Sequence, residues 1–144
     1  MRKFSGKTYS ENTEHTFSEL LEIVSILRSP EGCAWDNSQT HESMKECLVN
    51  ETEEVLSAID GKDFENLCEE LGDVLLQVLL HSEIAKEEGK FCFSDVVQTL
   101  SEKLIRRHPH VFGDVKRPET PEESLKLWQS VKAKEKALKR KQNK

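Results

Sequence analysis

EELGDVLLQVLLH, residues 69–81, joins three acids to an apolar run that only Gln77 interrupts. We expect it to lie in a helix of about residues 63–88, which begins at an Asp63 cap and ends at Gly89. Because this helix is apolar on almost every side, other elements must cover several of its faces. A chain of 144 residues can barely supply that cover. The stretch therefore predicts a helical bundle that a second copy of the chain completes.

Four further helices follow from periodicity and capping signals. Apolar residues recur at helical spacing over about residues 15–28 and 40–59. Ser94 can cap a helix that runs to about Arg107. The sequence 120–123, TPEE, is a capping box with proline at the first helical position, and it starts a last helix. No strand signal is present, so we expect an all-α protein with a four-helix-bundle-like core built from about five helices.

The remaining segments set the expected domain limits. Residues 1–14 are polar and lack a period, so we expect a flexible lead-in. Residues 15–140 form the predicted domain, and residues 141–144 a basic tail. Residues 29–39 carry the turn-forming residues of a loop, although Trp35 within it is apolar enough to need a burial site.

Charge and composition exclude several classes of function. The net charge of −6 argues against binding to nucleic acid, because such binding requires a basic surface. No apolar run approaches the roughly 20 residues that a membrane span needs. The four cysteines are scattered singly, with no C-x-x-C pair and no secretory segment before them. We therefore expect a soluble cytoplasmic protein without a membrane or nucleic-acid partner.

Residues 50–73 are unusually rich in acids. They include nine acidic residues, and only Lys62 opposes them. An ordinary solvated helix face interleaves lysines for pairing at i,i+4, so this segment has accepted self-repulsion that something must offset. A bound divalent cation would offset it.

Four of these acids form the predicted metal site, and we call them the acid quartet: Glu51, Glu54, Glu70 and Asp73. Each pair is spaced by three residues and projects from one helix face. Two such helices, packed antiparallel across the connection 60–62, can bring the pairs together. Glu51 and Glu70 also fall on apolar stripes, where unpaired acids are costly. An all-oxygen set of this kind prefers Mg²⁺ or Mn²⁺ to zinc.

The same acids have two alternative interpretations. The acids could instead form the solvated rim of a charged bundle, and their spacing alone leaves that interpretation open. A di-iron carboxylate bundle would typically need Glu-x-x-His units that face inward. The sequence contains none.

Carboxylates repel phosphate, so an acid cluster acts on a phosphorylated substrate through bridging metal ions. Lys103, Arg106 and Arg107 could neutralise the remaining phosphate charge, and they lie within little more than one helical turn. Their alternative role is to complement the dipole at a helix C-terminus. His108 and His110 are weak metal candidates, because no cysteine or further histidine accompanies them. The residues predict hydrolysis of a phosphate anhydride.

Taken in order, five motifs resemble the MazG family of all-α nucleoside triphosphate pyrophosphohydrolases. They span about residues 17–138 and read LRSPEGCAWDNSQT (27–40), NETEEVLSAI (50–59), EELGDVLLQVLLH (69–81), KLIRRHPHVF (103–112) and LWQSVKAKE (127–135). The family's metal motif is E-E-x-x-E followed by E-x-x-D. The second block is intact here, whereas Asn50 replaces the first glutamate of the first block.

The resemblance implies both a site and a reaction. It assigns the acid quartet as the ligands of Mg²⁺, with Mn²⁺ as a substitute, so Asn50 removes no expected ligand. It implies cleavage of a nucleoside triphosphate between the α and β phosphates, giving a nucleoside monophosphate and pyrophosphate. It also implies a homodimer or a dimer of dimers. The implied substrate contacts are Lys103, Arg106, Arg107, Trp128 and Lys132.

The element R-R-H-P-H-V-F makes the chain resemble the first domain of tandem MazG proteins, standing alone. The two domains of such proteins need not be equally competent. The alternative function is therefore a catalytically silent helical dimer that binds nucleotides or a protein partner.

Overall fold

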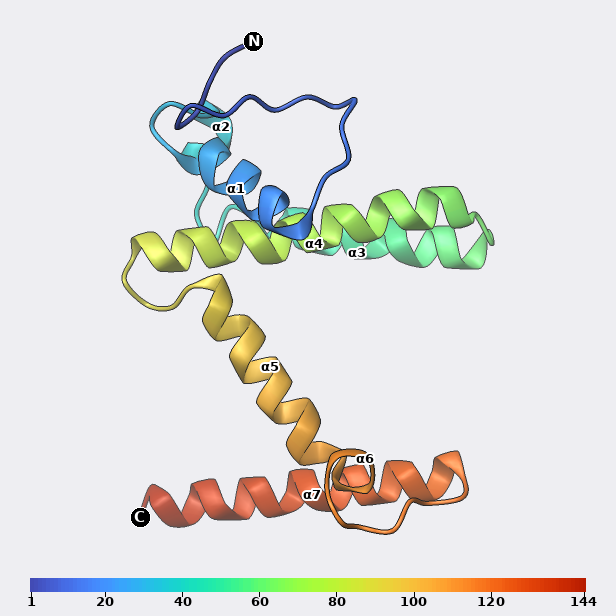
Figure 1. Ribbon diagram of the computed structural model, residues 1–144. Coiled ribbons are helices and arrows are strands. Elements are labelled where there is room, and N and C mark those ends of the chain that lie inside the picture. The colour runs from blue at the N-terminus through green and yellow to red at the C-terminus, as the bar shows by residue number, and fades with distance from the viewer. The chain divides into compact units, whose positions relative to one another are not determined.

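The computed structural model describes all 144 residues, and it contains seven helices and no strand. The predicted all-α class is confirmed. The five expected helices are present, and two short ones accompany them (Figure 1). The chain divides into two compact units, residues 1–93 and 94–144, which are described separately below. None of the helices combines the length and the apolar character that crossing a membrane requires.

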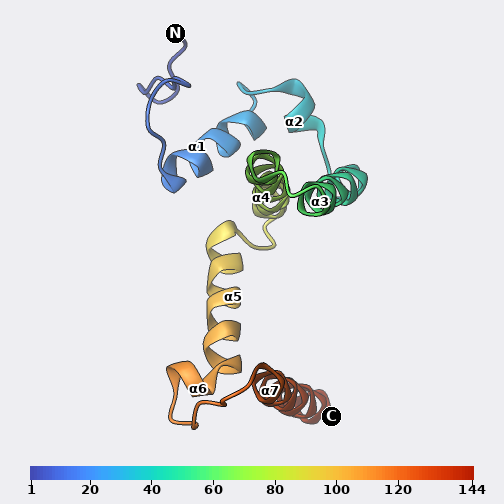
Figure 2. The same cartoon turned by 90° about the vertical axis from the view of Figure 1, so that its right-hand side faces the viewer.

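The first unit is built around a pair of long helices. It contains α1 (Phe17–Arg28), α2 (Ala34–Ser38), α3 (Lys45–Asp60) and α4 (Phe64–Glu87). Helices α3 and α4 run side by side in opposite directions, joined by a short turn, and α1 packs on α4 (Figures 1 and 2). Two acid-bearing helices are thus neighbours along their length.

Local signals explain where these helices begin and end. The Asp63 side chain accepts a hydrogen bond from the Asn66 backbone at 3.1 Å, as the sequence predicts for the start of α4. Just beyond the last residues of α4, Gly89 adopts a positive φ of 68°, a conformation that glycine tolerates and other residues rarely adopt. Helix α1 begins at a capping box between Thr16 and Glu19, which the pattern T-x-x-E could have revealed.

The core of the first unit lies where α1, the start of α3 and α4 meet. Val24, Met44, Leu79 and Leu80 are its buried apolar residues. Beside it, the buried guanidinium of Arg28 binds the Glu87 carboxylate at 2.5 Å and donates to the backbone carbonyls of Asp36 and Gln39 at 2.6 and 2.7 Å. One side chain therefore fastens the ends of α1, α2 and α4 together.

Part of the apolar surface of α4 stays uncovered. Phe64, Leu71 and Val78 repeat every seven residues and are 75%, 52% and 38% exposed. The sequence led us to expect cover on several faces of this helix, and the single chain leaves this one open. Trp35, in contrast, was expected to be buried, and that prediction is wrong. It lies in the short helix α2 and is 56% exposed.

The second unit contains most of α5 (Phe93–Arg107), α6 (Pro109–Phe112) and α7 (Pro121–Gln142). Thr120 caps α7 by accepting from the Glu123 backbone at 3.2 Å. The Glu123 carboxylate accepts from the backbone of Glu119 instead of Thr120, which shifts the predicted capping box by one residue. None of these helices contains a buried residue.

Candidate functional site

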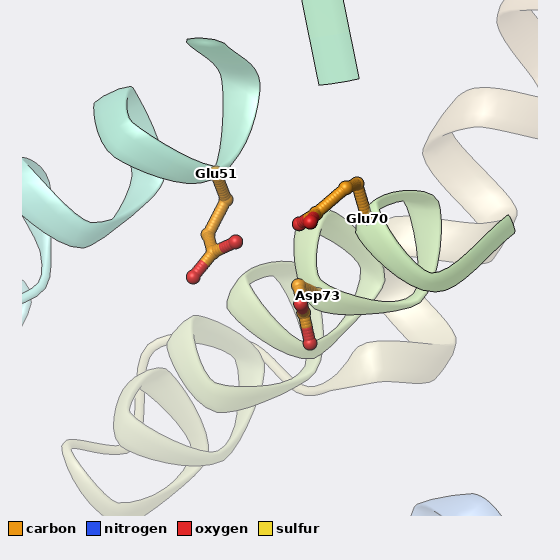
Figure 3. A group of neighbouring side chains, drawn as sticks. All are labelled: Glu51, Glu70 and Asp73. Carbon is orange, nitrogen blue, oxygen red and sulfur yellow. The ribbon is translucent and has the colours of Figure 1, made fainter. Parts of the chain in front are cut away.

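Three members of the acid quartet converge between α3 and α4. Glu51 projects from α3, and Glu70 and Asp73 project from α4 toward the same space (Figure 3). One carboxylate oxygen from each lies within 4.8 Å of the others. Because the helices are antiparallel and the acids of each pair are three residues apart, the two pairs meet at one level of the helix pair.

The position of Glu70 makes the cluster electrostatically unusual. Its side chain is buried, and its Oε2 atom lacks a hydrogen-bond partner. A hydrogen bond with Glu54, burial, and the charges of Glu54, Asp73 and Glu51 raise the pKa of Glu70 to about 7. A hydrogen bond between two carboxyl groups needs a shared proton. Near neutral pH the cluster therefore resists full ionisation without a cation.

Glu51 shows the same tendency from the opposite helix. Burial raises its pKa first, and the charges of Asp73 and Glu54 add to the effect. Its buried Oε2 atom also has no hydrogen-bond partner. Two buried carboxylate oxygens without partners are rare in native proteins, and each calls for an explanation.

The chemistry of this donor set fits a hard divalent cation. Every side chain offers oxygen, no histidine or cysteine belongs to the group, and the oxygens are close enough to share an ion. Mg²⁺ and Mn²⁺ prefer such ligands, whereas zinc favours nitrogen and sulfur. The residues therefore fit the predicted ion.

The other acids of this segment lie outside the cluster. Glu53 and Glu69 are exposed, as is Asn50, the residue that departs from the family's motif. Glu54 is also exposed, although its carboxyl reaches Glu70. The three converging acids are thus the better shielded ones.

The second unit brings three cationic side chains together with one aromatic ring and one acid. We call this group the cation cluster: Arg106, Arg107, Trp128, Lys132 and Glu135. Arg106 Nε lies 2.5 Å from Glu135 Oε1, and Arg107 Nη2 lies 3.0 Å from Glu135 Oε2. Hydrogen bonds from both arginines lower the pKa of Glu135 to about 2. Glu135 is thus a fixed anion between two cations.

Trp128 lies against the same cations. The Arg107 guanidinium carbon is 5.4 Å from the centre of the Trp128 ring, and Lys132 Nζ is 5.0 Å from it. Cation–π contacts of this geometry hold the charged groups against the ring. Of the predicted substrate contacts, the structure therefore groups Arg106, Arg107, Trp128 and Lys132. Lys103 is half-buried one turn earlier on α5.

Sequence reasoning missed Glu135 as a partner of these arginines. The two segments are 28 and 29 residues apart, so no helical spacing relates them. The available signal was its sequence context, because Glu135 is a lone acid among the lysines of residues 132–136.

Comparison with known proteins identifies relatives of the chain. Residues 39–112 match the family described as the MazG nucleotide pyrophosphohydrolase domain. This range contains the whole acid quartet together with Arg106 and Arg107.

Two curated relatives illustrate the match. The chain is 55% identical over 124 residues to the nucleoside triphosphate pyrophosphohydrolase/pyrophosphatase MazG of Thermotoga maritima, covering 86% of this chain and 47% of that protein. It is 46% identical over 121 residues to a nucleoside triphosphate pyrophosphohydrolase of Escherichia coli K12, covering 83% of this chain and 46% of that protein. The chain thus spans about half the length of these relatives.

A solved structure matches this chain over almost the whole of its own length. The crystal structure of a mazG-related protein from Thermotoga maritima superposes with a TM-score of 0.67 and 33% sequence identity. The alignment covers 81% of this chain and 98% of that one.

Proposed function

The chain belongs to the MazG nucleotide pyrophosphohydrolase family, and we propose that it hydrolyses nucleoside triphosphates between the α and β phosphates in the presence of Mg²⁺. The products are a nucleoside monophosphate and pyrophosphate. The observation that carries the proposal is the convergence of Glu51, Glu70 and Asp73, with two buried carboxylate oxygens that lack a partner.

The acid quartet would hold the metal ion. Glu51, Glu70 and Asp73 supply converging oxygens, and Glu54 joins them through its contact with Glu70. Bound Mg²⁺ would supply charge neutralisation at the phosphate oxygens and would make a nearby water more acidic. The helix pair brings three of these carboxylates together.

The quartet also exchanges a proton with solvent when it loads. Glu70, with a pKa of about 7, must lose its proton before all four carboxylates can serve as ligands. We therefore expect metal affinity to weaken below pH 7. The carboxyl groups repel free phosphate, so substrate affinity must come from cations.

Arg106, Arg107 and Lys132 would supply those cations, with Lys103 as a further candidate. Arginine offers a planar set of N–H donors that matches phosphate oxygens, and lysine adds a point charge. Trp128 already contacts Arg107 and Lys132, which favours a role in holding these cations over a role in stacking a base. The side chains of the cation cluster would therefore bind the triphosphate.

We further propose that the protein acts as a homodimer or a dimer of dimers. On α5, Val97, Leu100 and Leu104 share one face and are 45%, 50% and 45% exposed. The stripe on α4 formed by Phe64, Leu71 and Val78 is exposed as well. A second copy would cover apolar surface of this kind, as the composition of α4 already suggested.

A substrate screen tests the proposed reaction. The purified protein is incubated with each common ribonucleoside and deoxyribonucleoside triphosphate plus Mg²⁺, and pyrophosphate release is measured. We expect release from at least one nucleotide, with Mn²⁺ able to replace Mg²⁺ and EDTA abolishing it. Folded protein that binds nucleotide but releases no pyrophosphate would favour the alternative, a silent nucleotide-binding dimer.

A further inference from the structure

The Glu135 carboxylate contacts only part of each of two guanidinium groups. Its Oε1 accepts from Arg106 Nε at 2.5 Å, and its Oε2 accepts from Arg107 Nε at 3.3 Å and from Nη2 at 3.0 Å. These bonds use one nitrogen of Arg106, the Nε next to its aliphatic chain, and two nitrogens along one edge of the Arg107 guanidinium. Both terminal nitrogens of Arg106 and Nη1 of Arg107 are left for another acceptor.

The Glu135 carboxylate is charged and largely shielded from solvent. Its pKa of about 2 keeps Glu135 ionised at any physiological pH. Its side chain is 17% exposed and that of Arg107 is 16% exposed, whereas Arg106 is 51% exposed. Glu135 and Arg107 are therefore both shielded from solvent, whereas the guanidinium of Arg106 is the more accessible one.

Arg107 is fixed from a second direction. Glu135 binds one edge of its guanidinium plane, and the Trp128 ring lies 5.4 Å from its central carbon. An edge contact combined with a ring contact leaves the guanidinium little rotational freedom. Because ordering a long side chain costs conformational entropy, an arginine that is already fixed binds an anion more tightly than a mobile one.

Charge balance explains why an anion is useful in a cationic site. Arg106, Arg107 and Lys132 carry three positive charges, and Glu135 carries one negative charge, which leaves a net charge of +2. Without Glu135, two adjacent guanidinium groups would repel each other and turn apart. With it, they stay together and still attract a polyphosphate.

We propose that Glu135 is a positioning residue, which aligns Arg106 and Arg107 so that their outer nitrogens bind the phosphates of the substrate. This inference rests on the proposed function, since it assumes that these arginines bind a polyphosphate. The opposite role for Glu135 is that of an internal competitor, which must be displaced before phosphate can bind. The two roles predict opposite changes in affinity when its charge is removed.

The decisive experiment measures binding without turnover. Inorganic tripolyphosphate is titrated by calorimetry into the wild-type protein, Glu135→Gln and Glu135→Asp, with Glu122→Gln as a control at an exposed acid of the same helix. We expect Glu135→Gln to weaken binding about tenfold. Glu135→Asp, which keeps the charge but has a shorter reach, should fall between the two, and the control should match the wild type.

Steady-state kinetics supply a readout that a purely structural role would not move. Glu135→Gln should raise KM for the triphosphate about tenfold while kcat stays within about twofold. Unchanged or tighter tripolyphosphate binding in Glu135→Gln would overturn the proposal, as would a wild-type protein that binds no tripolyphosphate. If binding weakens as expected but the wild type releases no pyrophosphate, the positioning role stands and the hydrolytic function fails.

Discussion

The same residue type behaves in opposite ways in the two units of the molecule. Glu70, in the acid quartet of the first unit, contacts other carboxyl groups, and its pKa rises to about 7. Glu135, in the cation cluster of the second unit, contacts two arginines, and its pKa falls to about 2. The neighbours decide the outcome, because nearby carboxyl groups favour the neutral form of Glu70 and nearby arginines favour the charged form of Glu135.

This contrast indicates what each group still needs. The cation cluster contains one counterion of its own, keeps a net charge of +2 and has N–H donors left for a further anion. No lysine or arginine side chain forms an ion pair with the acid quartet, and buried oxygens of Glu51 and Glu70 lack partners. An external cation is therefore expected at the quartet and an external anion at the cluster.

The largest expected effect follows from removing one charge of the quartet. Asp73→Asn keeps the shape of the side chain but loses the charge, so we expect pyrophosphate release to fall by about 100-fold or more. Circular dichroism should show an unchanged helix content. Glu54→Gln should behave in the same way.

The matched control for these variants is Glu69→Gln, a charge loss at an exposed neighbour on α4. It should retain nearly full activity. Retained turnover in both Asp73→Asn and Glu54→Gln would show that the metal lies elsewhere.

A second prediction concerns stability, which should respond to Mg²⁺ only while the quartet is intact. A ligand at about 100 times its Kd stabilises the folded state by about 2.7 kcal/mol. For a chain of this size, Tm should therefore rise by about 5 °C or more. In Glu70→Gln the rise should largely disappear.

The same variant tests the repulsion itself. At pH 8 without metal, Glu70 must ionise among like charges, so Glu70→Gln should melt at a higher temperature than the wild type. A metal-free variant that is less stable than the wild type at this pH would contradict the electrostatic account of the quartet.

A third prediction sharpens the other half of the contrast. Arg107→Ala removes the guanidinium that links Glu135 to Trp128, so KM for the triphosphate should rise about tenfold or more while kcat changes less. Arg140→Ala, at an exposed position near the end of α7, should leave KM unchanged. Equal effects of the two variants would indicate general charge attraction without a defined site.

The smallest expected effect comes from a histidine pair in the first unit that belongs to neither group. His41 Nδ1 and His81 Nδ1 are 2.7 Å apart, and burial followed by the charge of His41 lowers the pKa of His81. The unfolded chain therefore binds more protons than the folded chain near pH 6. The stability gained from neutral His81 is present above pH 6.5 and is lost as the pH falls.

His81→Asn should accordingly reduce the loss of Tm between pH 8 and pH 5.5, measured in EDTA. The difference from the wild type isolates the histidine, because the acid quartet titrates in both proteins. A wild-type Tm that falls no faster than that of the variant would contradict this assignment.

Local signals in the sequence predicted most of the fold. Periodicity and caps such as Asp63 gave the five long helices, because these features depend on residues a few positions apart. Helices α2 and α6 have five and four residues, too short to show a period. Trp35 was expected to be buried, but its exposure depends on which surfaces the chain brings together.

The same limit applies to the candidate site, where contacts set by nearby residues were predictable and contacts between distant segments were not. The spacing of Glu51, Glu70 and Asp73 was readable, because two short spacings and one tight turn place them together. The pairing of Arg106 and Arg107 with Glu135 was not readable, since it joins separate helices across 28 or more residues. Contacts of that range depend on tertiary packing, which helical periodicity does not encode.

The most direct test of the central claim is to identify the products by ³¹P nuclear magnetic resonance, using the best nucleotide from the substrate screen and Mg²⁺. The account predicts equal amounts of nucleoside monophosphate and pyrophosphate, formed by the wild type, absent in EDTA and almost absent with Asp73→Asn. A nucleoside diphosphate with inorganic phosphate, or no product from folded protein with any nucleotide, would contradict it.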